Sequence, residues 1–349
     1  MKSPPLLFAA ALIVLAPDPA ASQTTEGVRR TTGPVGSSDG ILDWLAYDEA
    51  GWRALGKGYH DTAEHEFQAA IEAARRAAPA EDRQLMARSY AGLALALEHQ
   101  GRAAQAEPLA RWALAVREAK YGPNSAAAAT HLGILARIEV ALGQSAKAEA
   151  SLRRALAIHD ALDQPDQYET SDFLAALGSL LVGQRRFAEA EPVLGRAITL
   201  REALMGFSHP ATVEVVLGLA GALFRQGKDD EALPLLTRAL TGIEQDRGRT
   251  HRNLVSPLLM IADIRGRRGE AAEAEAAYRR ALAVLDAANP LGDRETIGAL
   301  HRYADWLERA GRAAEAPPFR DRAVAIRGRL DGPRTAASPP TPAIHPRSF

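Results

Sequence analysis

The stretch Gly143-Gln144-Ser145-Ala146-Lys147-Ala148-Glu149-Ala150-Ser151-Leu152-Arg153-Arg154-Ala155 contains the pattern that decides the fold of this chain. If the glycine is taken as position zero, alanines stand at +5 and +12, and another small residue, Ala136, stands at −7. The same offsets recur about every 42 residues. The zero position, which we call the turn position, is occupied in successive copies by Gly58, Gly101, Gly143, Arg185, Gly227, Gly269 and Gly311. A fixed period of this length predicts a repeat protein of seven stacked units.

Each unit has the pattern of two amphipathic helices, which we call helix A before the turn position and helix B after it. In the third unit, Leu132 and Leu135 lie three residues apart in helix A, and Leu152 and Leu156 lie four apart in helix B. These spacings place the apolar residues of each helix on one face. Neither helix can bury that face alone, so the units must stack around a continuous core. The sequence therefore predicts an all-α solenoid of stacked antiparallel helix pairs over residues 41–330.

Small residues mark the places where helices must approach closely. The glycine suits a helix end, because it adopts the left-handed conformation without a side-chain clash. The alanines at +5 and +12 leave space that a large residue at +9 can fill, which gives interior packing density. The large residues at +9 are Phe67, Leu152, Leu194, Leu236 and Tyr278.

This order of small residue, turn, alanine, large apolar residue and alanine resembles the tetratricopeptide repeat. The usual repeat has about 34 residues and ends helix B with a proline. The longer period here resembles the kinesin-light-chain-like subclass, as does the stretch Arg196–Glu202 with the following Gly206 and His209-Pro210. The proline position holds an acid in this chain, namely Glu118, Asp160, Glu202, Glu244 and Asp286. The resemblance implies a right-handed superhelix whose concave face is formed by the A helices.

The concave face is the predicted binding surface for a protein or peptide partner. On the repeat register it is lined by helix A positions thirteen, ten, six, three and two before the turn. The candidate partner-binding residues at these positions are Trp52, Arg88, His99, Arg137, Asp172, Glu214, Phe224, Asp263, Arg267, His301 and Asp305. Charges of both signs with scattered apolar side chains suit an extended or helical peptide.

The subclass typically has an asparagine nine residues before the turn, where it holds peptide backbone. This chain instead has at that position Gly92, Ile134, Ala176, Gly218, Met260 and Arg302. The departure leaves side-chain pockets as the predicted way of binding a partner.

The N-terminus has the pattern of a signal peptide over residues 1–22. An unbroken apolar run, residues 6–16, follows a positive charge and is too short to span a bilayer. Ala20 and Ser22 then supply the small residues of a cleavage site before Gln23. An uncleaved anchor is the alternative interpretation. We expect an exported protein, periplasmic or secreted from a bacterial cell, with no stable membrane insertion after cleavage.

The segments that flank the repeats differ from them in composition. Residues 23–40 are rich in Thr, Ser and Gly and are expected to form a flexible leader. The proline-rich residues 331–349 are expected to form a disordered tail. In the first unit, Trp44 and Trp52 are expected either to cover the open end of the stack or to lie at the start of the groove.

Composition argues against several functions. Lys and Arg number 42 against 43 Asp and Glu, so the chain has no long-range attraction for nucleic acid or an anionic membrane. The absence of cysteine excludes thiol catalysis and cysteine-ligated metals. His60, Glu64 and His65 come nearest to a metal motif, but histidines five apart point to different sides of a helix. With no phosphate-binding loop and no nucleophile motif, we expect no metal, no cofactor and no catalysis.

An arginine also recurs beside the second alanine, at position +11. It could form a basic track for an acidic partner, or salt bridges to neighbouring helices, and the second interpretation is the more common one for surface charges. The residues concerned are Arg154, Arg196, Arg238, Arg280 and Arg322.

Three classes of function are compatible with these observations. The favoured one is an exported scaffold or adaptor that binds a peptide or protein partner in its concave groove. The second is a structural or oligomerising component of a cell-envelope assembly that acts through its convex face or its ends. The third is an enzyme whose active site carries no recognisable motif.

Overall fold

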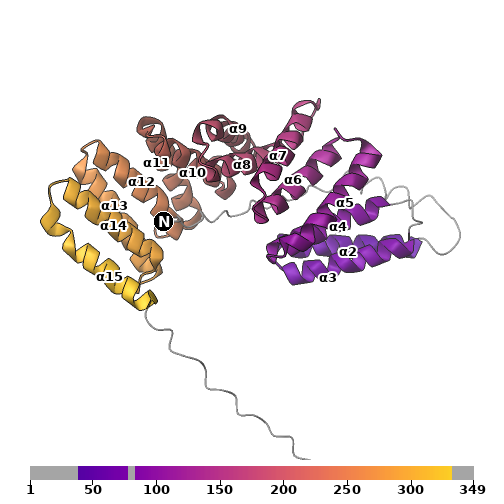
Figure 1. Cartoon of the computed structure of the whole chain (residues 1–349), viewed down its shortest axis with the longest axis horizontal. Helices are drawn as coiled ribbons and strands as arrows, with labels where there is room; N and C mark the ends of the chain where they lie inside the picture. The colour runs from indigo at the N-terminus through magenta and orange to yellow at the C-terminus, as the bar shows by residue number, and fades with distance from the viewer. Residues whose placement is uncertain (1–37, 78–82, 332–349) are drawn as a thin grey trace, which may run out of the picture. The chain divides into compact units, whose positions relative to one another are not determined.

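The computed structural model describes residues 38–77 and 83–331, and over these ranges the chain consists of helices and their connections, without strands (Figure 1). An A helix and a B helix alternate along the chain seven times. The pairs are α2 (Ser38–Gly56) and α3 (His60–Ala77), α4 (Arg83–His99) and α5 (Ala103–Tyr121), α6 (Ala126–Ala141) and α7 (Ser145–Asp160), α8 (Gln167–Gly183) and α9 (Phe187–Met205), α10 (Pro210–Arg225) and α11 (Asp229–Arg247), α12 (Val255–Arg267) and α13 (Ala271–Ala288), and α14 (Arg294–Arg309) and α15 (Pro317–Asp331). The predicted all-α solenoid of helix pairs is therefore confirmed. Short 3-10 helices, η1 (Arg252–Leu254) and η2 (Ala313–Glu315), precede α12 and α15.

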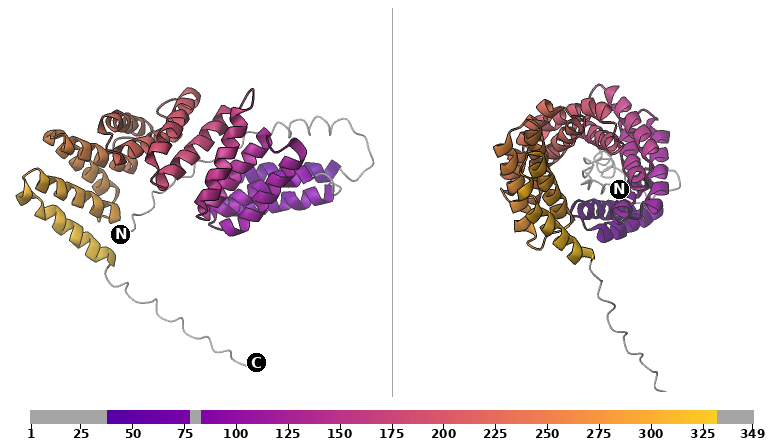
Figure 2. Two further views of the ribbon diagram at one scale, coloured as in Figure 1. Left: turned by 45° about the horizontal axis from the view of Figure 1, so that its top comes forward. Right: turned by 60° about the vertical axis from the view of Figure 1, so that its left-hand side comes forward.

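The chain divides into two compact units. The N-terminal unit comprises Met1–Phe207 with Glu214–Gln226, and the C-terminal unit comprises Ser208–Val213 with Gly227–Phe349. Within the N-terminal unit each helix from α2 to α9 packs against the next one, as the successive helices in Figure 2 show. Within the C-terminal unit the same holds from α11 to α15.

The turn positions have the backbone conformation that the repeat requires. At all seven the φ angle lies between +63° and +78°, including Arg185, where a side chain tolerates the left-handed region. A second set of left-handed glycines, which lies near the ends of B helices, comprises Gly122, Gly206, Gly248 and Gly292. A positive φ angle is thus found at every turn position and at four of the connections from a B helix to the next A helix, whereas the residue that caps the end of α7, Ala161, has a φ angle of −94°. The predicted phase of the repeat is confirmed.

The small residues of the repeat lie where two helices touch. Every alanine at +5 and +12, two in each of the seven units, is at most 1% exposed. The large residues at +9 are equally buried, and Phe67, Leu236 and Tyr278 are 0% exposed. In five of the seven units, the core therefore consists of methyl groups packed around one large side chain at +9, whereas the second and seventh units have Ala110 and Arg320 at this position.

We expect Ala190→Leu and Ala232→Leu to lower the free energy of unfolding by about 1–3 kcal/mol each, because both sites are filled and a larger side chain must displace its neighbours. Both alanines are 0% exposed. Thermal melts would measure the effect. The exposed Ala188 on the same helix provides the control, since Ala188→Leu should melt like the parent. Equal melting of all three variants would contradict the proposed packing.

The first helix begins earlier than the sequence indicates. We predicted a leader up to residue 40 and a helix from Ile41, whereas α2 begins at Ser38. The prediction was wrong for these residues because Gly40 packs closely on Ala77 of α3: a Cβ at Gly40 would lie 2.6 Å from the Ala77 Cβ. The predicted signal peptide, the rest of the leader and residues 332–349 of the tail lie outside the described residues, and Asp331 is the last residue of α15.

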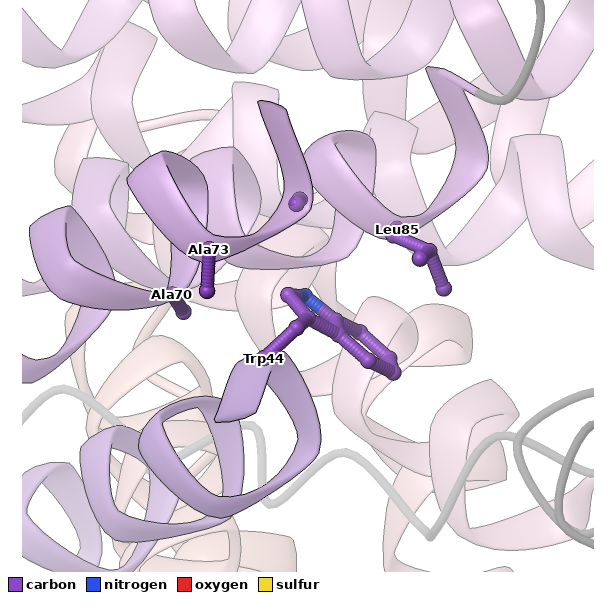
Figure 3. Packing of buried hydrophobic residues seen from close by; sticks show 5 residues of the cluster. Trp44, Ala70, Ala73 and Leu85 are labelled. Carbon is purple, nitrogen blue, oxygen red and sulfur yellow. The ribbon is translucent and has the colours of Figure 1, made fainter. Parts of the chain in front are cut away.

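Trp44 fills the interior of the first pair rather than covering its open end. Its ring is 3% exposed and packs against Ala70, Ala73 and Leu85 (Figure 3). Its indole N–H donates to Ser89 Oγ at 3.0 Å. The large apolar side chains that α2 does expose are Leu42 and Tyr47.

Candidate partner-binding face

Neighbouring A helices of the N-terminal unit are joined by ion pairs between residues about one repeat apart. Arg88 Nε of α4 lies 2.6 Å from Asp48 Oδ2 of α2. Arg137 Nε of α6 donates to Glu98 Oε2 of α4 at 2.9 Å. The predicted residues Arg88 and Arg137 are therefore on adjoining A helices as expected, but each is already held by a carboxylate.

His99 is neutral at physiological pH. Burial, the charge of Arg137 and the neighbouring His60 lower the pKa of His99 to about 4. Its ring stacks on that of His60 with 4.4 Å between centroids, and Arg137 Nη2 lies 2.7 Å from its Nε2. A neutral imidazole is the state that can accept this hydrogen bond from Arg137.

Three further predicted residues of the N-terminal unit differ in their surroundings. Trp52 is half-buried, with its ring edge-on to Phe67 at 5.2 Å between centroids. Glu214 is exposed on α10, and Phe224 on the same helix is half-buried. These side chains could contact a partner only in part, because Trp52 and Phe224 also pack on the protein itself.

Asp172 is not available to a partner, and its assignment to the groove was wrong. It is 5% exposed and accepts a hydrogen bond from Arg201 Nη2 of α9 at 2.7 Å. Arg201 is itself 1% exposed. The repeat register places position −13 on the groove side, but the buried cation at +16 of the same unit draws this carboxylate into the core.

The C-terminal unit holds its predicted residues in more exposed pairs. Arg302 Nη2 of α14 donates to Asp263 Oδ2 of α12 at 2.5 Å, and the Tyr278 hydroxyl donates to Asp263 Oδ1. Arg267 Nε donates to Asp229 Oδ2 at 2.8 Å, and the Arg267 side chain is 40% exposed. Arg88 and Arg137 of the N-terminal unit, by contrast, are only 17% and 11% exposed.

The last two predicted residues lie on α14. Asp305 Oδ1 accepts from Arg320 Nη2 of α15 at 2.8 Å, with the Asp305 side chain 55% exposed. His301 is half-buried, and its Nε2 lies 3.5 Å from Arg327 Nη2. Together with the exposed Arg267 and with Asp263, whose side chain is only 19% exposed, these residues form a polar surface on the A helices of the C-terminal unit. We call Asp263, Arg267, His301 and Asp305 the C-terminal A-face.

At least four of the five periodic arginines at +11 form salt bridges, as the second interpretation predicted. Arg154 Nη2 lies 2.7 Å from Glu118 Oε1 of the preceding unit. The same pairing joins Arg196 to Asp160, Arg280 to Glu244, and Arg322 to Asp286. The acids are those at the position where the usual repeat has proline, so both halves of each pair could have been found by their common period.

A second periodic contact was missed in the sequence. The residue directly after the turn position is arginine in three units, and each of these arginines binds a glutamate at +6 of the preceding unit. The pairs are Arg102–Glu64 at 2.7 Å, Arg186–Glu149 at 2.6 Å and Arg312–Glu275 at 2.5 Å. These contacts join successive turns and contribute to the stacking of units.

The suspected metal motif is used for other contacts. Glu64 binds Arg102, His60 stacks on His99, and His65 is exposed. Across residues 38–77 and 83–331, no group of three or more His, Cys, Asp or Glu side chains is placed to hold a metal ion. None of the helices α2–α15 combines the length and the hydrophobicity needed to cross a membrane.

One open hollow of about 350 Å³ lies between α7, α8 and α9. Its apolar lining includes Leu156 of α7 together with Leu174 and Leu177 of α8, and the Asp160–Arg196 pair stands at its edge. The hollow therefore marks the seam between two successive units rather than the A-helix face.

Family models of the tetratricopeptide repeat match most of the repeats. One matches residues 97–161 and 211–287, and another matches residues 170–211. These matches together cover more than half of the chain and coincide with the helix pairs of the structure. This chain belongs to the tetratricopeptide-repeat family.

Solved structures with a similar fold have low sequence identity to this chain. BtubC (BKLC) from P. vanneervenii has a TM-score of 0.55 and 18% identity, over 72% of this chain and 99% of its own. A putative kinesin light chain of nearly identical TPR-like repeats from Podosopora anserina has a TM-score of 0.50 and 19% identity, over 58% and 96%. A Rap protein complexed with competence and sporulation factor has a TM-score of 0.51 and 17% identity, over 88% and 80%. The likeness shows the fold, and a comparison with curated proteins found no match.

Proposed function

We propose that this chain is an exported, non-catalytic scaffold that binds a peptide or protein segment on the A helices of its repeats. Proteins of the tetratricopeptide-repeat family are typically scaffolds for protein binding. The observation that supports a site is the C-terminal A-face, where cationic, anionic and imidazole side chains lie on two successive A helices with partly exposed side chains. A surface of this kind matches a peptide of mixed charge.

Exposed ion pairs make this face suitable for exchange of partners. A solvent-exposed pair contributes only about 0–1 kcal/mol, so a carboxylate of an incoming peptide can replace Asp229 at Arg267 at little cost. In the N-terminal unit the equivalent pairs are much less exposed, and opening them would leave charges without water or a partner. We therefore propose that the first contacts with a partner form in the C-terminal unit.

A structural neighbour supports the ligand class. The Rap protein of similar fold was solved with competence and sporulation factor bound. By analogy, we propose that this chain also binds a separate factor, and the mixed charges of the C-terminal A-face favour a peptide or an extended segment of a protein.

Peptide selection would test this site. A phage-displayed library of random peptides would be selected against the purified chain, and the affinity of an enriched peptide would then be measured on single variants. We expect Arg267→Ala and His301→Ala each to weaken binding, by about tenfold where a contact worth about 1.4 kcal/mol is lost.

A matched control lies on a B helix. Arg279 of α13 has a 67% exposed side chain and an ion pair with Glu275, like the A-face arginine, so Arg279→Ala should leave peptide affinity unchanged. If selected peptides lose affinity with Arg279→Ala and keep it with Arg267→Ala and His301→Ala, the proposal is wrong and the B-helix side binds.

Export is part of the proposal and can be tested separately. The full chain, expressed in a bacterium, should accumulate in the periplasm or the medium with Gln23 as its first residue, which intact-mass measurement would detect. A deletion of residues 2–22 should retain the protein in the cytoplasm. Recovery of the uncut full-length chain in the membrane fraction would instead support an uncleaved anchor.

A structural or oligomerising role remains the second candidate. It is favoured by apolar side chains exposed on the outermost described helices, Tyr47 on α2 and Val324 on α15.

A further inference from the structure

One repeat position changes its exposure at the C-terminal end. The B-helix residue thirteen after the turn is apolar in every unit, and Leu240 at this position is half-buried. Val324 of α15 is 65% exposed. Within the chain this position is covered by the unit that follows, whereas no unit follows α15 among the described residues. The buried equivalents, at 5–8% exposure, are Ile71, Leu114, Leu156, Ile198 and Leu282.

The matching position changes its exposure at the N-terminal end. The A-helix residue eleven before the turn is Tyr47 in the first unit, where it is 40% exposed, and the half-buried Tyr90 in the second. In the other units this position packs against the unit that precedes it. The equivalents there, at most 3% exposed, are Leu132, Leu174, Val216, Leu258 and Leu300.

Contacts inside the N-terminal unit show that these two positions meet across a seam. Leu156 at +13 and Leu174 at −11 of the next unit line the same hollow between α7 and α8. A polar contact lies beside it, because His159 at +16 is 2.8 Å from Thr170 at −15 of the next unit. At this seam, therefore, position +13 meets −11 and position +16 meets −15.

The same pairing, applied to the two ends of the chain, joins opposite charges. Position +16 of the last unit is Arg327, and position −15 of the first unit is Asp43. Both side chains are exposed, and Arg327 Nη2 lies 3.5 Å from His301 Nε2. The apolar and charged residues of the two ends are thus complementary in the register of the repeat.

We propose that a second copy of this chain stacks its α2 on α15, so that the solenoid continues from one copy into the next. Tyr47 of one copy would cover Val324 of the other, and Asp43 would pair with Arg327. The contact joins two different surfaces, so each added copy brings a free end of its own, and association can continue beyond a dimer. With a single helix seam buried, it should be weak and depend on protein concentration. This inference is independent of peptide binding by the A helices.

Sedimentation velocity over two decades of concentration would test the stacking. The parent chain should show a rising mean sedimentation coefficient, whereas Tyr47→Arg and Val324→Arg should each remain monomeric. A mixture of these two variants should form a dimer and nothing larger, because the first keeps a functional α15 and the second a functional α2. Tyr47 and Val324 are both exposed, so the two variants should melt like the parent. Val140 is another exposed apolar residue, and Val140→Arg should leave association unchanged.

The charged pair provides a second readout. Asp43→Arg and Arg327→Asp should each reduce association, because each variant then brings like charges together at the junction. Mixing the two should restore association to the level of the parent chain in alternating copies, because every junction again joins an arginine to an aspartate. A parent chain that stays monomeric throughout would overturn the proposal. So would Tyr47→Arg protein that still dimerises alone, since this would indicate a two-fold contact between α15 helices.

Discussion

Replacing Asp172 with leucine is expected to lower the free energy of unfolding of the N-terminal unit by about 3–5 kcal/mol. The substitution leaves Arg201 as a cation that is 1% exposed and cannot lose its proton. Chemical denaturation of the purified chain would measure the loss. In the double variant with Arg201→Met, where no buried charge is left alone, a large part of the stability should return. A double variant as unstable as Asp172→Leu would contradict this account.

The pH dependence distinguishes the two partners. Burial raises the pKa of Asp172 to about 6, an effect that Arg201 only partly offsets. Because this value is higher than in the unfolded chain, the native state binds the proton more readily, and the contribution of this group to stability is lost as pH rises through about 6. Arg201→Met should raise the pKa of Asp172 further. The loss in free energy of unfolding that this variant shows relative to the parent should therefore become smaller as the pH falls from about 7.5 to about 5. The loss in free energy of unfolding caused by Asp172→Leu should persist over the same pH range, because Arg201 stays charged.

Phe67→Ala is expected to cost about 3–5 kcal/mol, since it removes the side chain that fills the space between three helices. Phe67 of α3 is 0% exposed, and its ring occupies the space next to Gly51 of α2 and Gly92 of α4. Thermal and denaturant unfolding would measure the loss. Phe207, at 43% exposure, provides the control, and Phe207→Ala should have an effect near zero.

A coupled substitution tests the same contact from the other side. A Cβ at Gly92 would lie 2.3 Å from Phe67 Cζ, so Gly92→Ala alone should be destabilising. Combined with Phe67→Leu it should be tolerated better than the sum of the two single effects, since the shorter side chain vacates that space. Strict additivity would show that the two residues do not share this space. The same contact explains why a glycine stands at Gly92, where the kinesin-light-chain-like subclass has asparagine.

Much of the fold could be predicted because the repeat is specified by residue size. An alanine is required wherever two helices touch and a left-handed residue wherever the hairpin turns, so both recur with the period of the structure. Even Arg185 follows the pattern, because the glycines at the six other turn positions indicate that this residue must adopt a positive φ angle. The start of α2 was missed because Ser38–Gly40 carry no apolar spacing, and the contact between Gly40 and Ala77 cannot be found by period.

The candidate site could be predicted only in part. The register placed Arg88 and Arg137 on adjoining A helices correctly, but their partners Asp48 and Glu98 come from the preceding unit. Asp172 was misassigned because its surroundings depend on a buried arginine 29 residues later, which no spacing within helix A reveals.

The sequence by itself determined that this chain is an all-α stack of seven helix pairs, and it determined the phase of the stack to the residue. It could do so because local spacing governs which face of a helix is apolar and where a hairpin turns. Only the tertiary structure decided which charged side chains are held in ion pairs and which apolar residues remain exposed on the end helices. These outcomes depend on side chains that meet across separate helices, often from the next unit, and the same residue type at the same repeat position can therefore be buried in one unit and accessible in another.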